Sequence, residues 1–401
     1  MESDRERWLT PGVKRIGAAS LLSDLGHEVP SSLLPRFLTS TLGAPAAALG
    51  LIEGVADGLA GIARLLGGAL ADDPEKRRAT AVAGYATTAI FSSFIGWAGN
   101  VFTVGFLRTA SWTARGLRAP SRNALLADAV PAGAYGRAYG FERAMDNLGA
   151  LGGPVLALAL ITVFSVRDAI LISIVPGLLA AVAMFSAVRH VPKLAVREHV
   201  KLRIKIAPVV RSRAGTFLTG IAAFEVGNVA ATLLILRASE SLSPGRSADR
   251  ATQIALVLYL AYNLAATLVS IQAGRTIDRS SGIRVLVAGV AMFAVSYVLF
   301  ATATANVAVL AAAFVLAGLG IGCVETAEHA TIAASAPEEL RGSAFGLVAA
   351  VQSFGNLAAS ATAGAIWTAV SPRAAFLYLA FWMVVAAGLL IWASQRTQSQ
   401  E

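Results

Sequence analysis

The two halves of this 401-residue chain carry the same turn and loop residues when the sequence is laid over itself with a shift of 206 positions. The matched residues are glycines, a proline and loop charges: Gly68, Asp72 and Arg78 fall on Gly274, Asp278 and Arg284, and Pro131, Gly136, Gly140 and Gly149 fall on Pro337, Gly342, Gly346 and Gly355. Because glycine and proline mark special backbone geometry, the match predicts that the same turns are built twice.

The repeated unit is a membrane bundle. The chain is 56% hydrophobic and only 14% charged, whereas a soluble domain carries about 25% charged residues. A membrane-spanning helix needs ~20 mostly apolar residues. Twelve stretches qualify: 14–38, 46–71, 79–98, 101–122, 138–163, 168–188, 214–237, 251–273, 284–304, 307–333, 344–368 and 373–394. We therefore predict an all-α membrane protein with twelve transmembrane helices in two pseudo-symmetric six-helix bundles.

The domain boundaries follow from the longest polar segment. Residues 1–188 form the predicted N-terminal bundle, 189–213 a basic cytoplasmic linker, and 214–401 the C-terminal bundle. Parallel repeats in a membrane chain indicate a transporter whose substrate site lies between the halves.

Basic residues predict the orientation. With both termini in the cytoplasm, most loop Lys and Arg residues fall on the cytoplasmic side, including Lys76, Arg77 and Arg78 and the central linker. This imbalance is the one that the positive-inside rule requires in a cell (inner or plasma) membrane. The net charge of +9 is thus a topology signal and a contact with anionic lipid, and it does not indicate nucleic-acid binding.

Ionisable residues within the apolar stretches point to function, because each costs about 3 kcal/mol at the bilayer centre unless it faces protein or water. Asp24, His27 and Glu28 are spaced three and four apart, so they project from one face of a helix. Buried carboxylates of this kind are candidates for proton coupling. The alternative is that Asp24 is a permanent ion-pair partner of Arg108.

The second half holds a counterpart of this cluster. Asp24-x-Gly26-His27 matches Glu225-x-Gly227-Asn228 at a shift of 201 positions, five fewer than elsewhere because a longer loop follows. Glu225 and Asn228 are therefore further candidates for the transport cavity.

The second apolar stretch and Arg108 of the fourth offer more buried charge. Glu53, Asp57 and Arg64 form one stripe at spacings of four and seven. These residues and Arg108 either form structural ion pairs, or Arg108 binds an anionic group of the substrate through its planar guanidinium.

Two clusters resemble metal-ligand sets, Asp24-x-x-His27-Glu28 and Glu325-x-x-Glu328-His329. Carboxylate and imidazole ligands suit iron, manganese or zinc. Their predicted depths differ, since one lies near the centre of the bilayer and the other near the cytoplasmic face, so no shared metal site is predicted.

A charge-complementary gate is predicted near the cytoplasmic surface. Under the shift of 206, positions 119 and 122 correspond to Glu325 and Glu328. One end of this pseudo-symmetric pair is basic, with Arg115, Arg118 and Arg122, and the other is acidic. Partly hydrated ion pairs between them would bias the conformational equilibrium by ~1 kcal/mol each. The alternative is that each set meets water or lipid headgroups separately.

The loop motifs resemble the signature sequences of the major facilitator superfamily. The resemblance rests on Gly68-Ala-Leu-Ala-Asp72 with Lys76-Arg77-Arg78, on Gly274-Arg-Thr-Ile-Asp278-Arg279 with Arg284, on Arg108, and on Gly149-x-x-x-Gly153-Pro154, which is similar to an antiporter motif. It implies that Asp72 approaches helix N-termini of the other half, favouring their positive dipole ends. Arg77, Arg78 and Asp128 would complete a gating ion-pair cluster. Gly149 and Gly153 give a flat face, predicted to pack against the other half.

Together these features predict a monomeric secondary active transporter of a small organic solute, working by alternating access as a drug or metabolite:H⁺ antiporter. It would not be an enzyme and would use no cofactor, only a proton gradient; its partners are the solute, protons and the bilayer, with no nucleic acid. The alternatives are proton-coupled uptake of an organic anion, divalent-metal transport, or a transporter-like sensor or lipid-moving protein.

Overall fold

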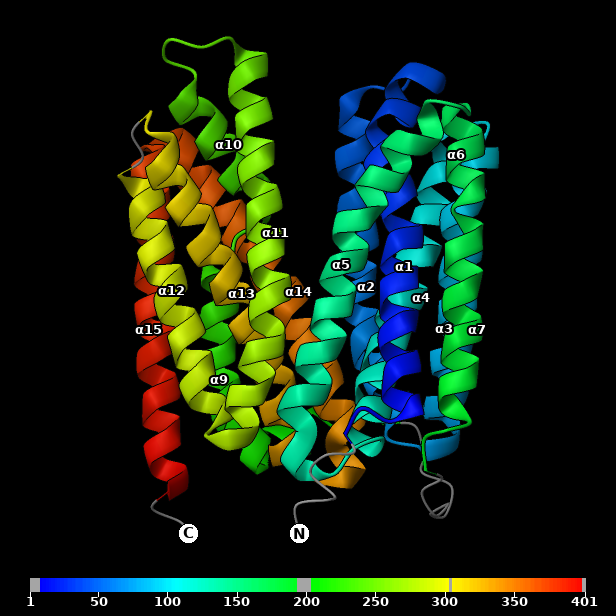
Figure 1. Ribbon diagram of the computed structural model, residues 1–401, viewed down its shortest axis with the longest axis vertical. Coiled ribbons are helices and arrows are strands. Elements are labelled where there is room, and N and C mark those ends of the chain that lie inside the picture. The colour runs from blue at the N-terminus through cyan, green and yellow to red at the C-terminus, as the bar shows by residue number, and fades with distance from the viewer. Residues whose placement is uncertain (1–7, 193–202, 303–304, 399–401) are drawn as a thin grey trace. The chain divides into compact units, whose positions relative to one another are not determined.

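The computed structural model describes residues 8–192, 203–302 and 305–398, and within these ranges the chain forms helices and no β-strand. Figure 1 shows the helices of each bundle running roughly side by side. The predicted all-α class is therefore confirmed.

The first half contains these elements: α1 (Pro11–Arg36), η1 (Phe37–Thr41), α2 (Ala46–Ala71), α3 (Pro74–Phe94), η2 (Ile95–Trp97), α4 (Val101–Asp128), η3 (Ala132–Ala134), α5 (Tyr135–Ile161), α6 (Val166–Ile172), α7 (Ile174–Val188) and α8 (Ile206–Arg211). The second half contains α9 (Arg213–Gly227), α10 (Ala231–Leu242), α11 (Ala248–Arg279), α12 (Gly282–Ala301), α13 (Val307–Ser335), η4 (Glu338–Leu340), α14 (Arg341–Ala369) and α15 (Pro372–Gln398).

Each of the twelve predicted stretches lies mainly in one long helix or in a broken pair, α6–α7 or α9–α10. Within the described residues, nine segments are long and apolar enough to cross a membrane. The three long helices outside that set are α1, α2 and α4, which carry Asp24, Glu53 and Arg108 among other charges. The number of twelve transmembrane helices stays a prediction. The helical membrane architecture itself agrees with the structure.

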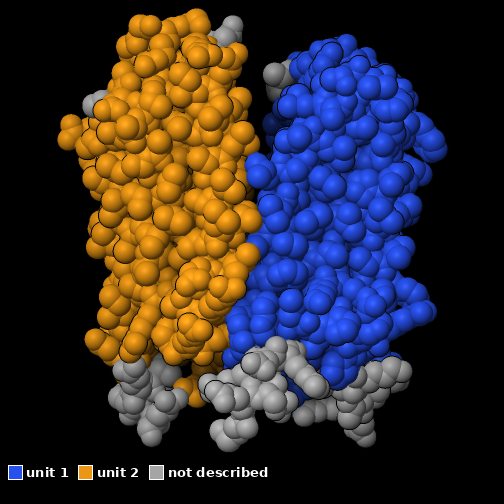
Figure 2. Space-filling model, in the orientation of Figure 1, with its two compact units in different colours: residues 1–209, 336–350 blue, residues 210–335, 351–401 orange. Residues whose placement is uncertain are grey.

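The chain divides into two compact units, coloured in Figure 2. Unit 1 comprises Met1–Val209 and Ala336–Ala350, and unit 2 comprises Val210–Ser335 and Val351–Glu401. The first turns of α14 thus group with the N-terminal half, although the rest of that helix belongs to unit 2. The predicted boundaries 1–188, 189–213 and 214–401 follow the order of the chain and stay a prediction. Residues 193–202 of the predicted linker lie outside the described residues.

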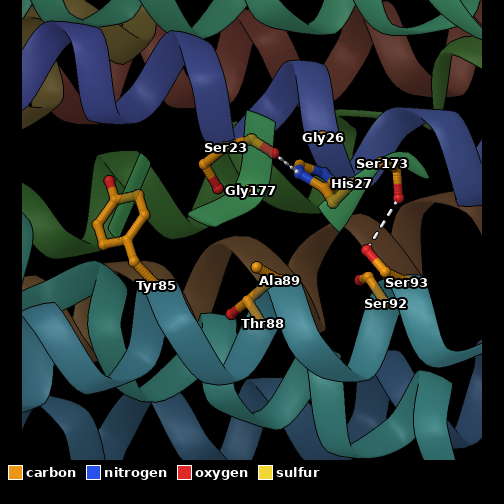
Figure 3. Close-up of a pocket in the computed structure, with 10 residues that line it drawn as sticks. All are labelled: Ser23, Gly26, His27, Tyr85, Thr88, Ala89, Ser92, Ser93, Ser173 and Gly177. Atoms are coloured by element: carbon orange, nitrogen blue, oxygen red, sulfur yellow. Dashed lines mark hydrogen bonds between the residues drawn. The ribbon is translucent and has the colours of Figure 1, made fainter. Parts of the chain in front are cut away.

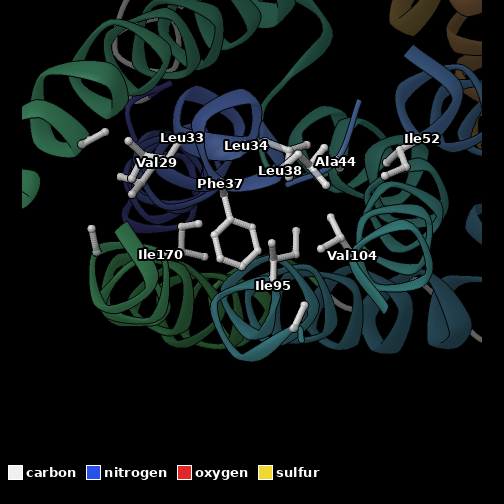
Figure 4. Packing of buried hydrophobic residues seen from close by; sticks show 13 residues of the cluster. Val29, Leu33, Leu34, Phe37, Leu38, Ala44, Ile52, Ile95, Val104 and Ile170 are labelled. Carbon is white, nitrogen blue, oxygen red and sulfur yellow. The ribbon is translucent and has the colours of Figure 1, made fainter. Parts of the chain in front are cut away.

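Local sequence signals explain the start of α1 and the packing at its far end. Thr10 caps α1 by accepting a hydrogen bond from the Val13 N–H, and Pro11 occupies the first helical turn, where proline is favoured. At the other end of α1, apolar side chains of α1, η1, η2 and α6 close the bundle, including Phe37, Ile95 and Ile170 (Figure 4). Asp24, His27 and Glu28 therefore precede this apolar plug along α1.

Candidate functional site

Asp24, His27 and Glu28 lie together on α1, as their spacing predicts. His27 Nδ1 is 3.3 Å from Asp24 Oδ1, and His27 Nε2 is 3.3 Å from Glu28 Oε1. The Asp24 and His27 side chains are buried, whereas the Glu28 side chain is 31% exposed. The imidazole thus lies between a buried carboxyl group and an accessible one.

Arg115 of α4 is the cation that faces this triad. Its Nη2 atom is 3.4 Å from Asp24 Oδ1, and its Nη1 atom contacts the His27 ring. The alternative pairing of Asp24 with Arg108 is wrong for this structure. Arg108 lies seven residues before Arg115, which is about 10 Å along the helix axis.

Arg108 instead pairs with α2. Its Nη2 atom is 3.0 Å from Glu53 Oε1, its Nη1 donates to Ser31 Oγ at 3.0 Å, and its guanidinium stacks 3.4 Å from the centre of the Trp112 ring. Trp112 Nε1 donates to Asp57 Oδ1 at 2.8 Å. Asp57 is exposed and the Glu53 side chain is 32% exposed. An anionic substrate would have to displace Glu53 to reach Arg108, so the accessible groups here are carboxylates.

A second buried charge network joins α1, α4 and α5. Arg122 Nη1 is 2.8 Å from Glu142 Oε1 and 3.3 Å from Asp146 Oδ1, and Arg143 contacts the same two acids at 2.7 and 3.3 Å. Ser20 donates to Glu142 at 2.6 Å. The sequence reasoning missed Glu142 and Arg143. Their signal was present, because three charged residues within five positions of an apolar helix require buried partners.

The gate between Arg115, Arg118 and Arg122 and the acids Glu325 and Glu328 stays a prediction. The expectation that its members are partly hydrated is wrong for Arg118, Arg122 and Glu328, because these three side chains are buried. Arg118 donates to Ser23 Oγ at 2.7 Å and stacks on the Tyr85 ring within unit 1. Glu328 accepts a hydrogen bond from Gln352 Nε2 at 2.9 Å within unit 2. These residues lie on the faces of their helices that point into the bundle. The position of a residue along the helix, which is all that the sequence analysis used, does not show which face it lies on. Glu325 is half-buried on the same helix.

A small pocket lined mainly by hydroxyl groups lies beside His27, between α1, α3 and the α6–α7 junction (Figure 3). Its polar lining residues are Ser23, His27, Tyr85, Thr88, Ser92, Ser93 and Ser173. His27 Nδ1 lies 2.9 Å from the Ser23 carbonyl oxygen. The imidazole is therefore bordered by hydroxyl groups as well as by Glu28.

The glycines of α5 pack against α1. A Cβ added to Gly149 would lie 2.9 Å from Asp24 Cβ, and one added to Gly153 would collide with Glu28 Cβ. The prediction that this face packs against the other half is wrong, because α1 and α5 belong to the same unit. Pro154 follows within α5. These glycines set the distance between α5 and the acidic face of α1.

Asp72 lies at the end of α2 and caps the start of α14, whose first turns belong to unit 1. Its Oδ1 accepts from the Ser343 N–H at 2.9 Å, and its Oδ2 accepts from Ser343 Oγ at 2.6 Å. Lys205 Nζ lies 3.0 Å from the same Oδ2. A Cβ on Gly68 would lie 2.8 Å from the Gly342 carbonyl oxygen, so glycine permits this approach.

Asp128 joins two arginines at the same end of the unit. Arg77 pairs with Asp128 Oδ2, and Arg341 Nη1 is 3.3 Å from Asp128 Oδ1. Arg78 instead donates to the carbonyl oxygens of Val188 and Pro192, at 2.7 and 2.6 Å. The structure therefore brings together Asp72 with Ser343 and Arg77 with Asp128. Arg78 lies apart from the predicted ion-pair cluster and binds carbonyl oxygens at and just after the end of α7.

The second copy of the loop motif is less buried. Gly274 is buried in α11 and Asp278 is half-buried near its end, while Arg279 and Arg284 are exposed. The two copies therefore share turn residues without sharing the same degree of enclosure.

Unit 2 holds its own small polar site where the helix is broken between α9 and α10. Asn228 Nδ2 donates to Glu225 Oε2 at 3.1 Å, and the Asn228 carbonyl accepts from Asn356 at 2.8 Å. Glu225 is buried. Gly355 of α14 packs directly on Glu225 Cβ, as Gly149 packs on Asp24.

Comparisons with known proteins identify the family. The family model described as Major Facilitator Superfamily matches residues 16–245 and 215–401. The chain belongs to the major facilitator superfamily. Members of this superfamily are transporters, so the protein is a membrane transporter and not an enzyme.

Among its relatives, an uncharacterized MFS-type transporter of Methanocaldococcus jannaschii is 28% identical over 97% of this chain and 96% of its own length. An uncharacterized protein of Mycobacterium tuberculosis is 30% identical over 44% of each chain. The first likeness agrees with the family, and neither description gives a substrate.

Solved structures share the fold at low identity. The human organic anion transporter MFSD10 matches with a TM-score of 0.74 at 14% identity, covering 95% of this chain and 99% of its own. A bacterial homologue of the iron transporter ferroportin, in the outward-facing state, matches with a TM-score of 0.74 at 13% identity, covering 96% of this chain and 99% of its own. At such identities the match concerns the fold alone.

Proposed function

We propose that this superfamily member is a secondary active transporter that exchanges a small organic solute for protons by alternating access. The observation that carries the proposal is the connected triad of buried Asp24, bridging His27 and partly exposed Glu28. A buried carboxyl group linked through an imidazole to an accessible carboxylate can take up and release a proton as the site is opened or closed to water. We therefore propose that the coupling site lies on α1.

The accessible surface beside the triad supports an amphipathic solute with a cationic group. Glu28, Glu53 and Asp57 are the exposed or partly exposed acids there, and Trp112 supplies an aromatic face. Export is the proposed direction, because Gly149, Gly153 and Pro154 resemble the antiporter motif. Uptake of an organic anion is less well supported, since Glu53 and Ser31 already occupy Arg108.

The proposed setting is the cell membrane, with both termini in the cytoplasm as the basic loops predict. The Asp72 and Asp128 clusters would then close the cytoplasmic side during part of the cycle. In each cycle, proton binding at Asp24 would alternate with the breaking of the contacts that Asp72 and Asp128 make.

Proteoliposomes that contain the full chain and the trapped pH dye pyranine test the proposal. Three probes are added separately under a pH gradient: ethidium as an organic cation, benzoate as an organic anion, and Mn²⁺. We expect ethidium entry to be matched by proton exit, with an unchanged result for the exposed-acid control Glu75→Gln.

The other results overturn the proposal. Solute and protons moving in the same direction would replace antiport with symport, and proton movement with Mn²⁺ alone would replace the organic solute with a metal. Ethidium flux without proton movement would remove proton coupling, and no proton movement with any probe would remove all three solute classes.

A further inference from the structure

Arg118 of α4 is a buried cation without a carboxylate contact. Its side chain is 3% exposed, yet among the described residues its guanidinium group contacts no carboxylate, and its Nε atom makes no hydrogen bond. On the same helix, Arg115 Nη2 lies 3.4 Å from Asp24 Oδ1. Arg122 Nη1 lies 2.8 Å from Glu142 Oε1. Because a buried charge is strongly destabilising unless it is paired, Arg118 requires a negative charge from another source.

Two groups that contact Arg118 line the hydroxyl pocket beside His27 (Figure 3). Arg118 Nη2 donates to Ser23 Oγ at 2.7 Å, and the guanidinium carbon lies 3.7 Å from the centre of the Tyr85 ring. The face of an aromatic ring attracts a cation without neutralising it. The pocket has a volume of about 10 Å³, which suits one particle of the size of water and excludes an organic molecule.

The hydroxyl protons of most pocket residues already have acceptors. Thr88 and Ser173 donate to backbone carbonyl oxygens of the preceding helical turn, at 2.7 and 2.6 Å. Ser92 Oγ and Ser93 Oγ lie 2.6 and 3.0 Å from the hydroxyl oxygen of another serine. These four side chains can therefore satisfy one another and the backbone without a ligand.

Ser23 and Tyr85 keep protons that can point into the pocket. Ser23 Oγ accepts from Arg118, so its own proton is available for donation. Tyr85 is 1% exposed, and within the part of the chain that the structure describes its hydroxyl group makes no hydrogen bond. Buried hydroxyl groups almost always have a hydrogen-bond partner. Two available donors beside a buried positive charge favour an anion, which only accepts hydrogen bonds.

We propose that this pocket binds one small inorganic anion of the chloride type between Ser23 Oγ and Tyr85 Oη. The anion accepts a hydrogen bond from each hydroxyl group, and its charge balances that of Arg118 on the other side of Ser23. It thereby joins α1 to α3 within unit 1. The proposal concerns anion binding and stability, and it does not depend on the proposed solute or on proton coupling.

Equilibrium dialysis of the purified full chain against radiolabelled chloride, with sodium gluconate holding the ionic strength constant, tests the site. We expect one saturable chloride per chain. The unfolding temperature should also rise as chloride replaces gluconate, because a ligand that binds only the folded state stabilises it. Tyr85→Phe removes the hydroxyl group and keeps the ring against Arg118. It should weaken chloride binding about tenfold or more, as expected for the loss of a hydrogen bond to an ion.

Tyr139→Phe is the matched control, because Tyr139 is another buried tyrosine of unit 1 but donates to the Asn123 carbonyl oxygen at 2.7 Å. It should keep the wild-type chloride affinity. Arg118→Gln should remove the chloride dependence of the unfolding temperature, since no buried charge then needs balancing. The proposal is overturned if no saturable chloride binding is found, if Tyr85→Phe binds chloride as tightly as the wild type, or if both tyrosine variants weaken binding equally.

Discussion

The site in unit 1 and its counterpart in unit 2 keep the same contacts with different chemistry. In unit 1, His27 lies 3.3 Å from Asp24, and Arg122 lies 3.3 Å from Asp146. In unit 2, Asn228 lies 3.1 Å from Glu225, and Gln352 lies 2.9 Å from Glu328. The repeat relates these residues in pairs: His27 and Asn228, Asp24 and Glu225, Arg122 and Glu328, and Asp146 and Gln352.

The comparison shows that the repeat preserved these contacts, while His27 and Asp146 of unit 1 correspond to the amides Asn228 and Gln352 of unit 2. Gln352 is an amide, so it can donate to Glu328 but cannot hold a proton for Glu225. We therefore expect proton coupling at the imidazole–carboxyl site of unit 1, whereas in unit 2 the carboxyl groups of Glu225 and Glu328 face amides.

The largest difference should appear in coupling. Asp24→Asn should abolish accumulation driven by a pH gradient, because an amide cannot release a proton, while solute exchange continues. Glu225→Gln should lower the rate by no more than about threefold, which is under ~1 kcal/mol in barrier. Both are measured in proteoliposomes with the solute that moves protons in the pyranine assay. Equal loss of gradient-driven accumulation in both variants would break the asymmetry between the units.

Stability should show the second largest difference. Glu142→Ala removes a carboxylate that lies 2.8 Å from Arg122 and 2.7 Å from Arg143, and removing one member of a buried ion-pair network costs about 3–5 kcal/mol. Glu328→Gln should cost under ~1 kcal/mol, since an amide already faces it. Chemical unfolding in detergent measures both. A small cost for Glu142→Ala would show that water replaces the carboxylate and that the network is not sealed.

The repeat and its backbone requirements were readable from the sequence. The shift of 206 places Gly149 on Gly355, and each glycine packs on an acidic residue of the neighbouring helix. Asp72 was likewise predicted to reach a helix N-terminus, and it contacts the Ser343 N–H. Glycine spacing and loop charge carry this information because they reflect local backbone geometry.

The partners of the buried charges were not readable. Arg122 was assigned to a surface gate, yet it faces Glu142 and Asp146. Gly153 was assigned to the other half, yet it packs on Glu28. Periodicity shows which residues share a face of one helix, but which neighbouring helix that face meets depends on tertiary packing.

The α2–α3 turn should respond more strongly than its second copy. Asp72→Ala removes the cap of Ser343, which should cost about 1–2 kcal/mol, and it also removes the partner of Lys205. Asp278→Ala should cost less, because Asp278 is half-buried. Unfolding of Asp72→Ala, Lys205→Ala and the double variant forms a cycle. We expect the double variant to match Asp72→Ala; fully additive costs would show that Lys205 acts through another group.

The smallest expected difference lies at the helix that follows each turn. Asp73 caps α3 by accepting from the N–H groups of Glu75 and Lys76 at 3.0 and 3.3 Å. Ser281 occupies the same place before α12 and, within the described residues, makes no side-chain cap. Asp73→Ala should therefore cost ~1 kcal/mol of unfolding free energy, and Ser281→Ala close to zero.

The pH dependence of this cap gives the sharper test. Burial raises the pKa of the Asp73 carboxyl, but hydrogen bonds from Lys76 and Glu75 outweigh it and hold the pKa below its ordinary value. A lowered folded-state pKa stabilises the protein above the unfolded pKa of about 3.9, and the contribution is lost as pH falls through the folded value. The difference between wild type and Asp73→Ala should thus persist near neutral pH and shrink only in acid. A difference that does not change across this range would mean that the cap is not ionic.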